Sequence, residues 1–180
     1  LDSEGEIGES VKFRSSPALA DYLYNPGVEI EDTIYIGSEK YFWAVELGQM
    51  DRPAFKKKWV YPTGTNVTSS PAVAEDLTIY FLARTQEGAG VLCALRDGGT
   101  LPIPRWKTHD LGPIPDSESA LASRPAVVTE TIDGRQINVT YFVAGDRLYR
   151  VEDWEQGYLV RSRYDLIEGN GEPQSGSPAV

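Results

Sequence analysis

The sequence predicts an all-β fold made of four-stranded units that repeat along the chain. The first indication is a five-residue phrase, Ser69-Ser70-Pro71-Ala72-Val73, that recurs in related form at residues 15–19, 123–127 and 176–180. The prolines of the four phrases, Pro17, Pro71, Pro125 and Pro178, are 54, 54 and 53 residues apart. A phrase that returns at such an interval is typical of stacked structural units.

The second indication is the pattern inside the first unit. Its apolar segments are short, rich in β-branched and aromatic residues, and separated by Gly, Pro, Asn and Asp, which predicts strands and turns. We expect strands at Thr33–Gly37 and Tyr41–Leu47, joined by a tight turn at residues 38–40, and at Lys57–Tyr61, with the Ser-Pro-Ala phrase as the first strand.

The later units repeat this order. The expected strands are 77–82, 91–95 and 105–107 in the second unit and 137–143, 147–151 and 160–164 in the third. No segment keeps a 3.6-residue apolar period over the ~11 residues that a helix requires. Each unit is therefore predicted to be four antiparallel strands.

Such a unit buries one face well only when another sheet stacks on it. Repeated radially, these units make a β-propeller, and a proline at the start of a strand costs little there. A long β-sandwich is the alternative fold. The expected organisation is an acidic lead-in (1–14), three blade-like repeats (15–68, 69–122 and 123–175) and the start of a fourth (176–180).

Three blades are too few for a ring, because propellers have ~4 to 8. The chain begins with Leu1 and stops inside a phrase, so we expect a piece of a longer polypeptide whose remaining blades belong to the same chain or another subunit. Expressed alone, this stretch is expected to aggregate or form oligomers.

The order of these segments resembles the pyrroloquinoline-quinone-like (PQQ-like) propeller repeat of quinoprotein dehydrogenases and their non-enzymatic relatives. In that family an Ala before an acidic turn and a Trp that follows after a Gly form a docking contact between blades. Ala44 with Trp59 and Ala94 with Trp106 match this pair, whereas the third unit has Arg150 and Tyr164 in those places. The resemblance implies an extracytoplasmic protein and a fold that serves many functions.

Composition narrows the function. With 27 acidic and 17 basic residues among 180, the net charge is -10, which disfavours binding to nucleic acid or to anionic membrane surfaces. No apolar window reaches the ~18 to 20 residues that span a bilayer. The single cysteine, Cys93, lies in an apolar run and is interpreted as a packed thiol.

Few residues indicate catalysis. One histidine, His109, and one cysteine do not make a zinc site of the usual kind. The carboxylates at 29–32, 116–118 and 152–155 lack the spacing of a loop calcium site, and solvated turns are the simpler interpretation. The adjacent cysteine pair common in the dehydrogenase relatives is missing from this stretch. We therefore expect no cofactor, no metal ligand and no catalytic residue here.

Two surface features remain. Lys56-Lys57-Lys58 is interpreted as protection for the exposed outer strand of a blade, where lysines discourage edge-to-edge pairing. Tyr22 and Tyr24 lie in an extra loop of the first unit and are candidates for contact with a protein partner.

Two sites match the N-glycosylation acceptor, Asn66-Val67-Thr68 in a predicted loop and Asn138-Val139-Thr140 on a predicted strand. Asn66 is the better candidate. The sequence thus predicts a non-catalytic propeller module that holds protein partners in an envelope or cell-surface assembly. The alternative is a fragment of a PQQ-dependent quinoprotein dehydrogenase, and a carbohydrate or small-ligand binder is a third, weaker reading.

Overall fold

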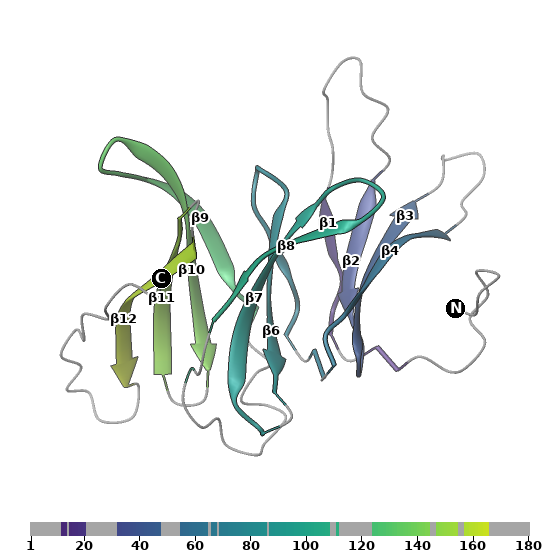
Figure 1. Ribbon diagram of the computed structural model, residues 1–180, viewed down its shortest axis with the longest axis horizontal. Coiled ribbons are helices and arrows are strands. Elements are labelled where there is room, and N and C mark those ends of the chain that lie inside the picture. The colour runs from purple at the N-terminus through teal and green to yellow at the C-terminus, as the bar shows by residue number, and fades with distance from the viewer. Residues whose placement is uncertain are drawn as a thin grey trace.

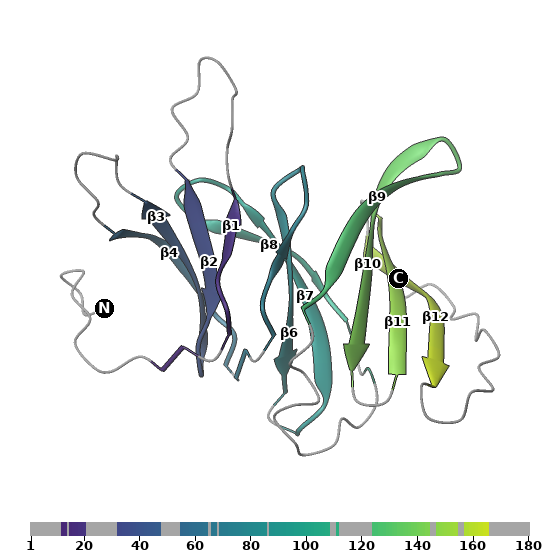
Figure 2. The ribbon, with the colours of Figure 1, turned by 180° about the vertical axis from the view of Figure 1, so that it is seen from behind.

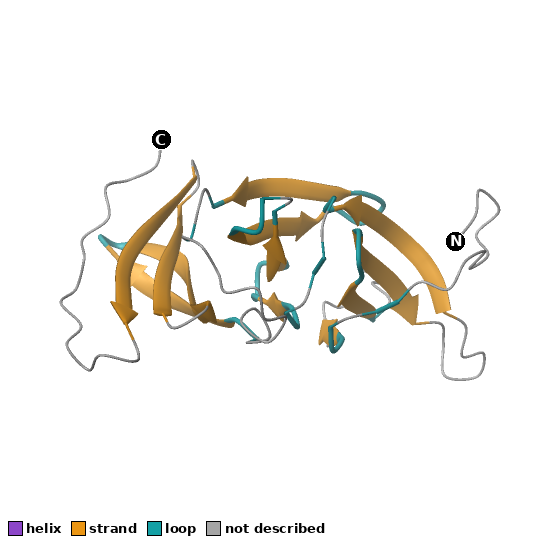
Figure 3. Cartoon of the chain, turned by 90° about the horizontal axis from the view of Figure 1, so that it is seen from below, coloured by secondary structure: helices purple, strands orange, loops and turns teal. Residues whose placement is uncertain are grey.

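The computed structural model describes residues 12–13, 15–20, 32–47, 55–64, 66–67, 69–85, 87–108, 111, 124–144, 147–154 and 157–165, of which 162–165 by their backbone alone. Every regular element in these ranges is a β-strand (Figure 3). The all-β prediction is confirmed. The same ranges hold no helix with the length and apolar composition needed to span a bilayer.

The strands form three four-stranded antiparallel sheets, each built from consecutive strands (Figure 1). Sheet 1 contains β1 (Ala18–Ala20), β2 (Thr33–Gly37), β3 (Tyr41–Leu47) and β4 (Phe55–Pro62). Sheet 2 contains β5 (Ala72–Val73), β6 (Thr78–Arg84), β7 (Gly90–Asp97) and β8 (Pro102–Lys107). Sheet 3 contains β9 (Ala126–Ile132), β10 (Arg135–Ala144), β11 (Arg147–Trp154) and β12 (Gly157–Asp165).

Local chemistry explains where the strands start and turn. The phrase prolines Pro17, Pro71 and Pro125 each stand directly before the first strand of a sheet, where the missing N–H costs little. The β9–β10 hairpin turns through Asp133 and Gly134 at φ 50° and 75°, the two positive angles that a type I′ turn requires. Figures 1 and 2 show this hairpin projecting past the other strands of sheet 3.

The three sheets share a β-bulge at one position of the third and fourth strands. The register shifts between Ala44 and Val45, between Ala94 and Leu95, and between Arg150 and Val151. Each shift leaves one cationic residue of the fourth strand without an opposite partner in the ladder: Lys58, Arg105 and Arg161. A bulge redirects side chains, and it gives each sheet a cation at the same place.

Sheet 2 lies between sheets 1 and 3 (Figures 1 and 2) and packs on both. In the core between sheets 1 and 2, the rings of Phe42 and Phe81 stack with centroids 4.1 Å apart. Between sheets 2 and 3, Leu82 and Leu92 meet Phe142 and Tyr149. A close approach at the first core explains Gly37, because a Cβ there would lie 2.3 Å from the Val67 side chain.

Candidate functional site

The first junction, between sheets 1 and 2, is organised around the buried carboxylate of Asp97. Tyr35 donates its hydroxyl to Oδ2 at 2.5 Å, and Trp59 donates its indole N–H to Oδ1 at 2.9 Å. The ammonium group of Lys58 lies 2.8 Å from Oδ2, with its side chain only 9% exposed. Aromatic and cationic donors from sheet 1 are thus held by one acid of sheet 2.

The second junction, between sheets 2 and 3, repeats this arrangement around Asp153. Tyr80 donates to Oδ2 at 2.5 Å and Trp106 donates to Oδ1 at 2.7 Å. The guanidinium group of Arg105 lies 3.0 Å from Oδ1, with its side chain 23% exposed. The donors occupy corresponding strand positions at both junctions, so the contact is a repeated feature of the fold.

The two acids nevertheless differ in pKa. Burial by itself raises the pKa of Asp97, but the hydrogen bonds from Lys58, Tyr35 and Trp59 outweigh it and hold the pKa below its ordinary value. Burial also raises the pKa of Asp153, and there the donors do not compensate, so the pKa is above its ordinary value. Asp97 has a fourth donor, the Gly99 N–H at 2.8 Å.

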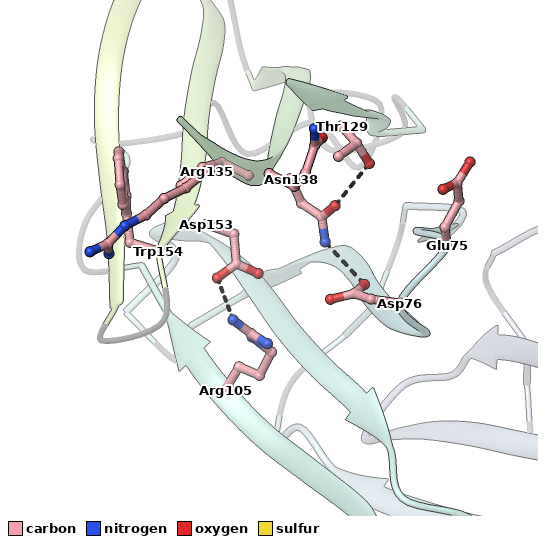
Figure 4. A pocket seen from close by; sticks show the side chains of 10 residues that line it. Glu75, Asp76, Arg105, Thr129, Arg135, Asn138, Asp153 and Trp154 are labelled. Carbon is pink, nitrogen blue, oxygen red and sulfur yellow. Dashed lines mark hydrogen bonds and ion pairs between the residues drawn. The ribbon is translucent and has the colours of Figure 1, made fainter. Parts of the chain in front are cut away.

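A polar pocket of about 680 Å³ opens beside Asp153 (Figure 4). It is lined by the β5–β6 turn of sheet 2, by β8, by the β9–β10 hairpin and by the end of β11. The lining residues are Glu75, Asp76, Arg105, Thr129, Arg135, Gln136, Ile137, Asn138, Asp153 and Trp154.

Most polar groups of this pocket bond to one another. Asn138 donates to Asp76 at 3.0 Å and accepts from Thr129 at 3.3 Å, which ties the hairpin to sheet 2 (Figure 4). Asp76 also accepts from the backbone N–H of Thr78 at 3.1 Å. These bonds show that the pocket residues hold the hairpin against sheet 2. Burial raises the pKa of Asp153, and three side chains already bind its carboxyl group.

The face of sheet 3 turned away from sheet 2 is charged. Arg150 pairs with Glu130 at 2.8 Å and with Glu152, and Arg161 pairs with Glu152 at 3.0 Å. Burial raises the pKa of Glu152, but the bonds from Arg150, Arg161 and Trp154 outweigh it, so the pKa is lowered. The bulge cation Arg161 thus binds an acid of its own sheet.

The face of sheet 1 turned away from sheet 2 is apolar. We call it the sheet 1 outer face; it is formed by Leu19, Ile34, Ile36, Trp43, Val45 and Val60. Leu19 is 54% exposed, and Phe13 and Tyr41 pack edge-on against Trp43. Leu47 occupies the position that corresponds to Asp97 and Asp153, so this face offers no acceptor for a Tyr and Trp pair.

The residues expected to form the docking contacts between blades do not all occupy corresponding positions in the three sheets. Ala44 lies opposite Trp59 in the ladder and Ala94 lies opposite Trp106, and both alanines are fully buried. In sheet 3, Arg150 lies opposite Ser162, whereas Tyr164 lies opposite Leu148. Placing Tyr164 at the docking position was wrong, because Ser162, directly after the bulge cation Arg161, occupies the position of Trp59 and Trp106.

Two charge interpretations also need correction. Lys56 is exposed at the edge strand β4, as protection of that edge requires, but Lys58 is buried against Asp97 because the bulge turns it inward. Glu152 and Asp153 do not belong to a solvated turn, since both are buried on β11. Sequence spacing alone did not reveal that these two acids are buried and paired with arginines.

The glycosylation candidates lie in different surroundings. Asn66 is exposed in the connection between sheets 1 and 2. Asn138 is half-buried, and its side-chain amide nitrogen is engaged with Asp76. The partner-contact candidates Tyr22 and Tyr24, together with His109, lie outside the described residues. Cys93 is buried, and burial raises the pKa of its thiol to about 12, so the thiol is protonated at neutral pH.

Sequence reasoning missed the acids that organise the junctions and the residues of the pocket. One signal for the pocket was present, because Asp133-Gly134 between alternating apolar and polar residues is a strong hairpin indicator. It predicts the turn of the β9–β10 hairpin that lines the pocket.

Within the described ranges, no group of three or more His, Cys, Asp or Glu residues is placed to hold a metal ion. No protein-family model matches the chain, and the search of curated proteins also found no match.

Proposed function

We propose that the chain is a non-catalytic interaction and scaffold module, built as part of a β-propeller and working in an extracytoplasmic or cell-surface assembly. Three sheets that stack through a repeated contact support the propeller geometry, because the donors of sheet 1 meet the acid of sheet 2 and the donors of sheet 2 meet the acid of sheet 3. Further sheets of the same polypeptide or another subunit would complete the ring.

The observation that carries the proposal is the sheet 1 outer face. In the described part of the chain no sheet packs on this face. Contiguous apolar patches of this kind mark interaction sites. The buried acids and the indoles of Trp59 and Trp106 are, by contrast, already committed to contacts between sheets. Binding through surfaces therefore fits these residues better than catalysis at a centre.

Site-specific photo-crosslinking in cells that make the full-length protein tests this function. A photo-reactive side chain at Leu19, which is 54% exposed, is compared with the same group at Ile103, which is 52% exposed on sheet 2. We expect adducts with another polypeptide from position 19 and few from position 103. Equal yields from the two positions would contradict the proposal. Adducts only within the same chain would show that a further sheet of the same polypeptide, and not another subunit, covers this face.

The catalytic alternative has its own assay. The purified full-length protein is mixed with PQQ and Ca²⁺, and bound quinone absorbance and dye-linked alcohol oxidation are measured. We expect neither signal. Stoichiometric quinone binding with turnover would replace the scaffold by a quinoprotein dehydrogenase.

The location is tested through Asn66. In a compartment that carries out N-glycosylation, intact mass should show a glycan that Asn66→Gln removes, whereas Asn138→Gln leaves it in place because Asn138 is held by Asp76. Protease added to intact cells should also cleave an extracytoplasmic chain, which checks the location where the host adds no glycan.

A further inference from the structure

The sheet 1 outer face is the side of sheet 1 that, in the other two sheets, receives a neighbour. In sheet 2 this side carries Asp97 and receives the donors of sheet 1, and in sheet 3 it carries Asp153 and receives the donors of sheet 2. Leu47 stands at the same ladder position in sheet 1. Within the described ranges, no sheet lies against this side of sheet 1. It is therefore a receiving side whose neighbour comes from elsewhere.

A phenylalanine stands beside Leu47 on this side. Phe55 lies opposite Leu47 in the ladder and is 76% exposed. Its counterpart in sheet 3 is Tyr158, which lies opposite Asp153 and packs against Trp106 of sheet 2 with ring centroids 5.1 Å apart. An aromatic ring at this position thus contacts the neighbouring sheet where that sheet is present.

The charges on this side restrict what can cover it. Lys57 is exposed and lies opposite Val45, so it shares the side with the apolar residues. The side carries no acid at its described ladder positions. Those positions are Leu19, Ile34, Ile36, Tyr41, Trp43, Val45, Leu47, Phe55, Lys57 and Val60. A complementary surface therefore has an apolar centre and an acid of its own for Lys57.

A second copy of this chain does not meet these requirements. The outer face of sheet 3 carries Arg150, Arg161 and their acid partners, and covering them with apolar side chains costs solvation without new bonds. Two copies of the sheet 1 outer face would place two Lys57 side chains in one contact that contains no acid. The complementary surface is therefore a different one.

The covering sheet also differs from the sheets of this chain. Both junctions inside the chain join a tyrosine, a tryptophan and a cation to an acid. The two end sheets (Figures 1 and 2) depart from this contact, since Leu47 replaces the acid in sheet 1 and Ser162 replaces the tryptophan in sheet 3. Terminal units of a repeat array are atypical in this way. The repeated contact thus stops at sheet 1, which favours another polypeptide as the source of the covering sheet.

We propose that the sheet 1 outer face docks a β-sheet of another polypeptide through an apolar contact that contains no buried acid. The partner sheet places aliphatic or aromatic side chains over Leu47 and Phe55, where the sheets of this chain place a cation, and it places an acid against Lys57 at the rim. A centre with aromatic residues and few charges inside a polar rim is the usual composition of such interfaces. The inference rests on the proposed function, because it specifies the partner of the same face.

Photo-crosslinking of the full-length protein in cells tests the chemistry of the contact. A photo-reactive side chain at Leu19 is combined with Leu47→Asp, which supplies the acid that sheets 2 and 3 have at this position. We expect the yield of the adduct with the partner polypeptide to fall about tenfold or more, because the new carboxylate is buried without a donor. Leu101→Asp, at a 69% exposed position before β8, is the control and should leave the yield unchanged.

Two further variants test the ring and the rim charge separately. Phe55 is exposed in the chain itself, so Phe55→Ala leaves sheet 1 folded, and it should lower the adduct yield about fivefold. Lys57→Gln should lower the yield about threefold, because a rim ion pair is lost. Lys56→Gln is its matched control on the other side of β4, where Lys56 pairs with Glu46, and should leave the yield unchanged.

The outcomes separate this inference from the proposed function. If position 19 gives no adduct in the otherwise unaltered chain, both are overturned. A partner adduct whose yield Leu47→Asp leaves unchanged or raises overturns the inference alone, since the covering sheet then carries donors for an acid. Adducts only within the same chain, or with a second copy of it, overturn the choice of partner. A yield unaffected by Phe55→Ala rejects the apolar contact, and one unaffected by Lys57→Gln rejects the acid of the partner.

Discussion

The two sheet junctions place a tyrosine, a tryptophan and a cation around a buried acid, yet the pKa of that acid shifts in opposite directions. At the first junction a buried ammonium group and a backbone N–H join the tyrosine and tryptophan, and the pKa of Asp97 falls. At the second, the cation is the more exposed Arg105, and burial keeps the pKa of Asp153 raised. A repeated contact therefore does not imply repeated energetics, because the number and burial of the donors decide the balance.

The largest expected difference between the junctions concerns their tryptophans. Trp59 is buried at 3% exposure, whereas Trp106 is only half-buried. Trp59→Ala should lower the free energy of unfolding by about 3–5 kcal/mol and Trp106→Ala by roughly 2 kcal/mol, because a deeper cavity costs more. Urea unfolding of both variants measures the difference. Equal losses would show that the two junctions are equally packed.

Substitution of the buried acid should also lower the free energy of unfolding more at the first junction than at the second. At pH 7, Asp97→Asn leaves the nearly buried Lys58 without its counter-charge and should cost about 3 kcal/mol. Asp153→Asn should cost about 1 kcal/mol, because Arg105 reaches solvent and the carboxylate was already disfavoured by burial. Chemical denaturation at neutral pH compares the two. A larger loss at Asp153 would reverse the assignment.

The pH dependence of stability should have opposite signs at the two acids. The lowered pKa of Asp97 means that its contribution is present above the ordinary value of 3.8 and is lost as the pH falls through the folded-state value. The raised pKa of Asp153 means that the folded state binds its proton more tightly, so stability declines as the pH rises from 3.8 through the folded-state value. Asp153→Asn should remove this decline and Asp97→Asn should not, as measured by unfolding free energies across that window. A decline that persists in Asp153→Asn would show that Asp153 does not cause it.

The smallest expected change in stability concerns the side-chain hydroxyl of Thr140 at the second junction. The Thr140 hydroxyl is buried and has no hydrogen-bond partner among the described residues, whereas the corresponding residue of the first junction is the apolar Ile79. Thr140→Val keeps the shape and removes the unsatisfied group, so it should stabilise by about 1 kcal/mol. Ile79→Val is the control and should destabilise by about 1 kcal/mol. Thermal unfolding measures both, and a destabilised Thr140→Val would show that the hydroxyl is satisfied.

Local patterns predicted most of the strands. Thr33–Gly37 and Tyr41–Leu47 were expected with the bounds that the structure has, because short runs of β-branched and aromatic residues between turn residues have few alternatives to a strand. The long strand β9 was expected only as the short phrase at residues 123–127. Its extension to Ile132 depends on the Asp-Gly turn that follows it.

The candidate contacts were harder to predict. The paired positions of Ala44 and Trp59 follow from the repeat, but the acceptor of the Trp59 indole lies 38 residues away in another sheet. The Tyr80 hydroxyl reaches an acid 73 residues away. The spacing of residues along the sequence does not reveal which residues meet across two sheets. Tyr164 was misplaced because an aromatic residue was expected at the docking position, which Ser162 occupies in sheet 3.

The sequence by itself determined the all-β class, the order of the strands and their grouping into three units, because strand and turn preferences act over a few residues. Only the tertiary structure decided that Asp97 and Asp153 are buried acceptors, that Lys58 turns inward while Lys56 stays exposed, and that Leu47 replaces the acid in sheet 1. These features arise when separate sheets meet, since burial and hydrogen-bond partners there come from residues far apart in the chain.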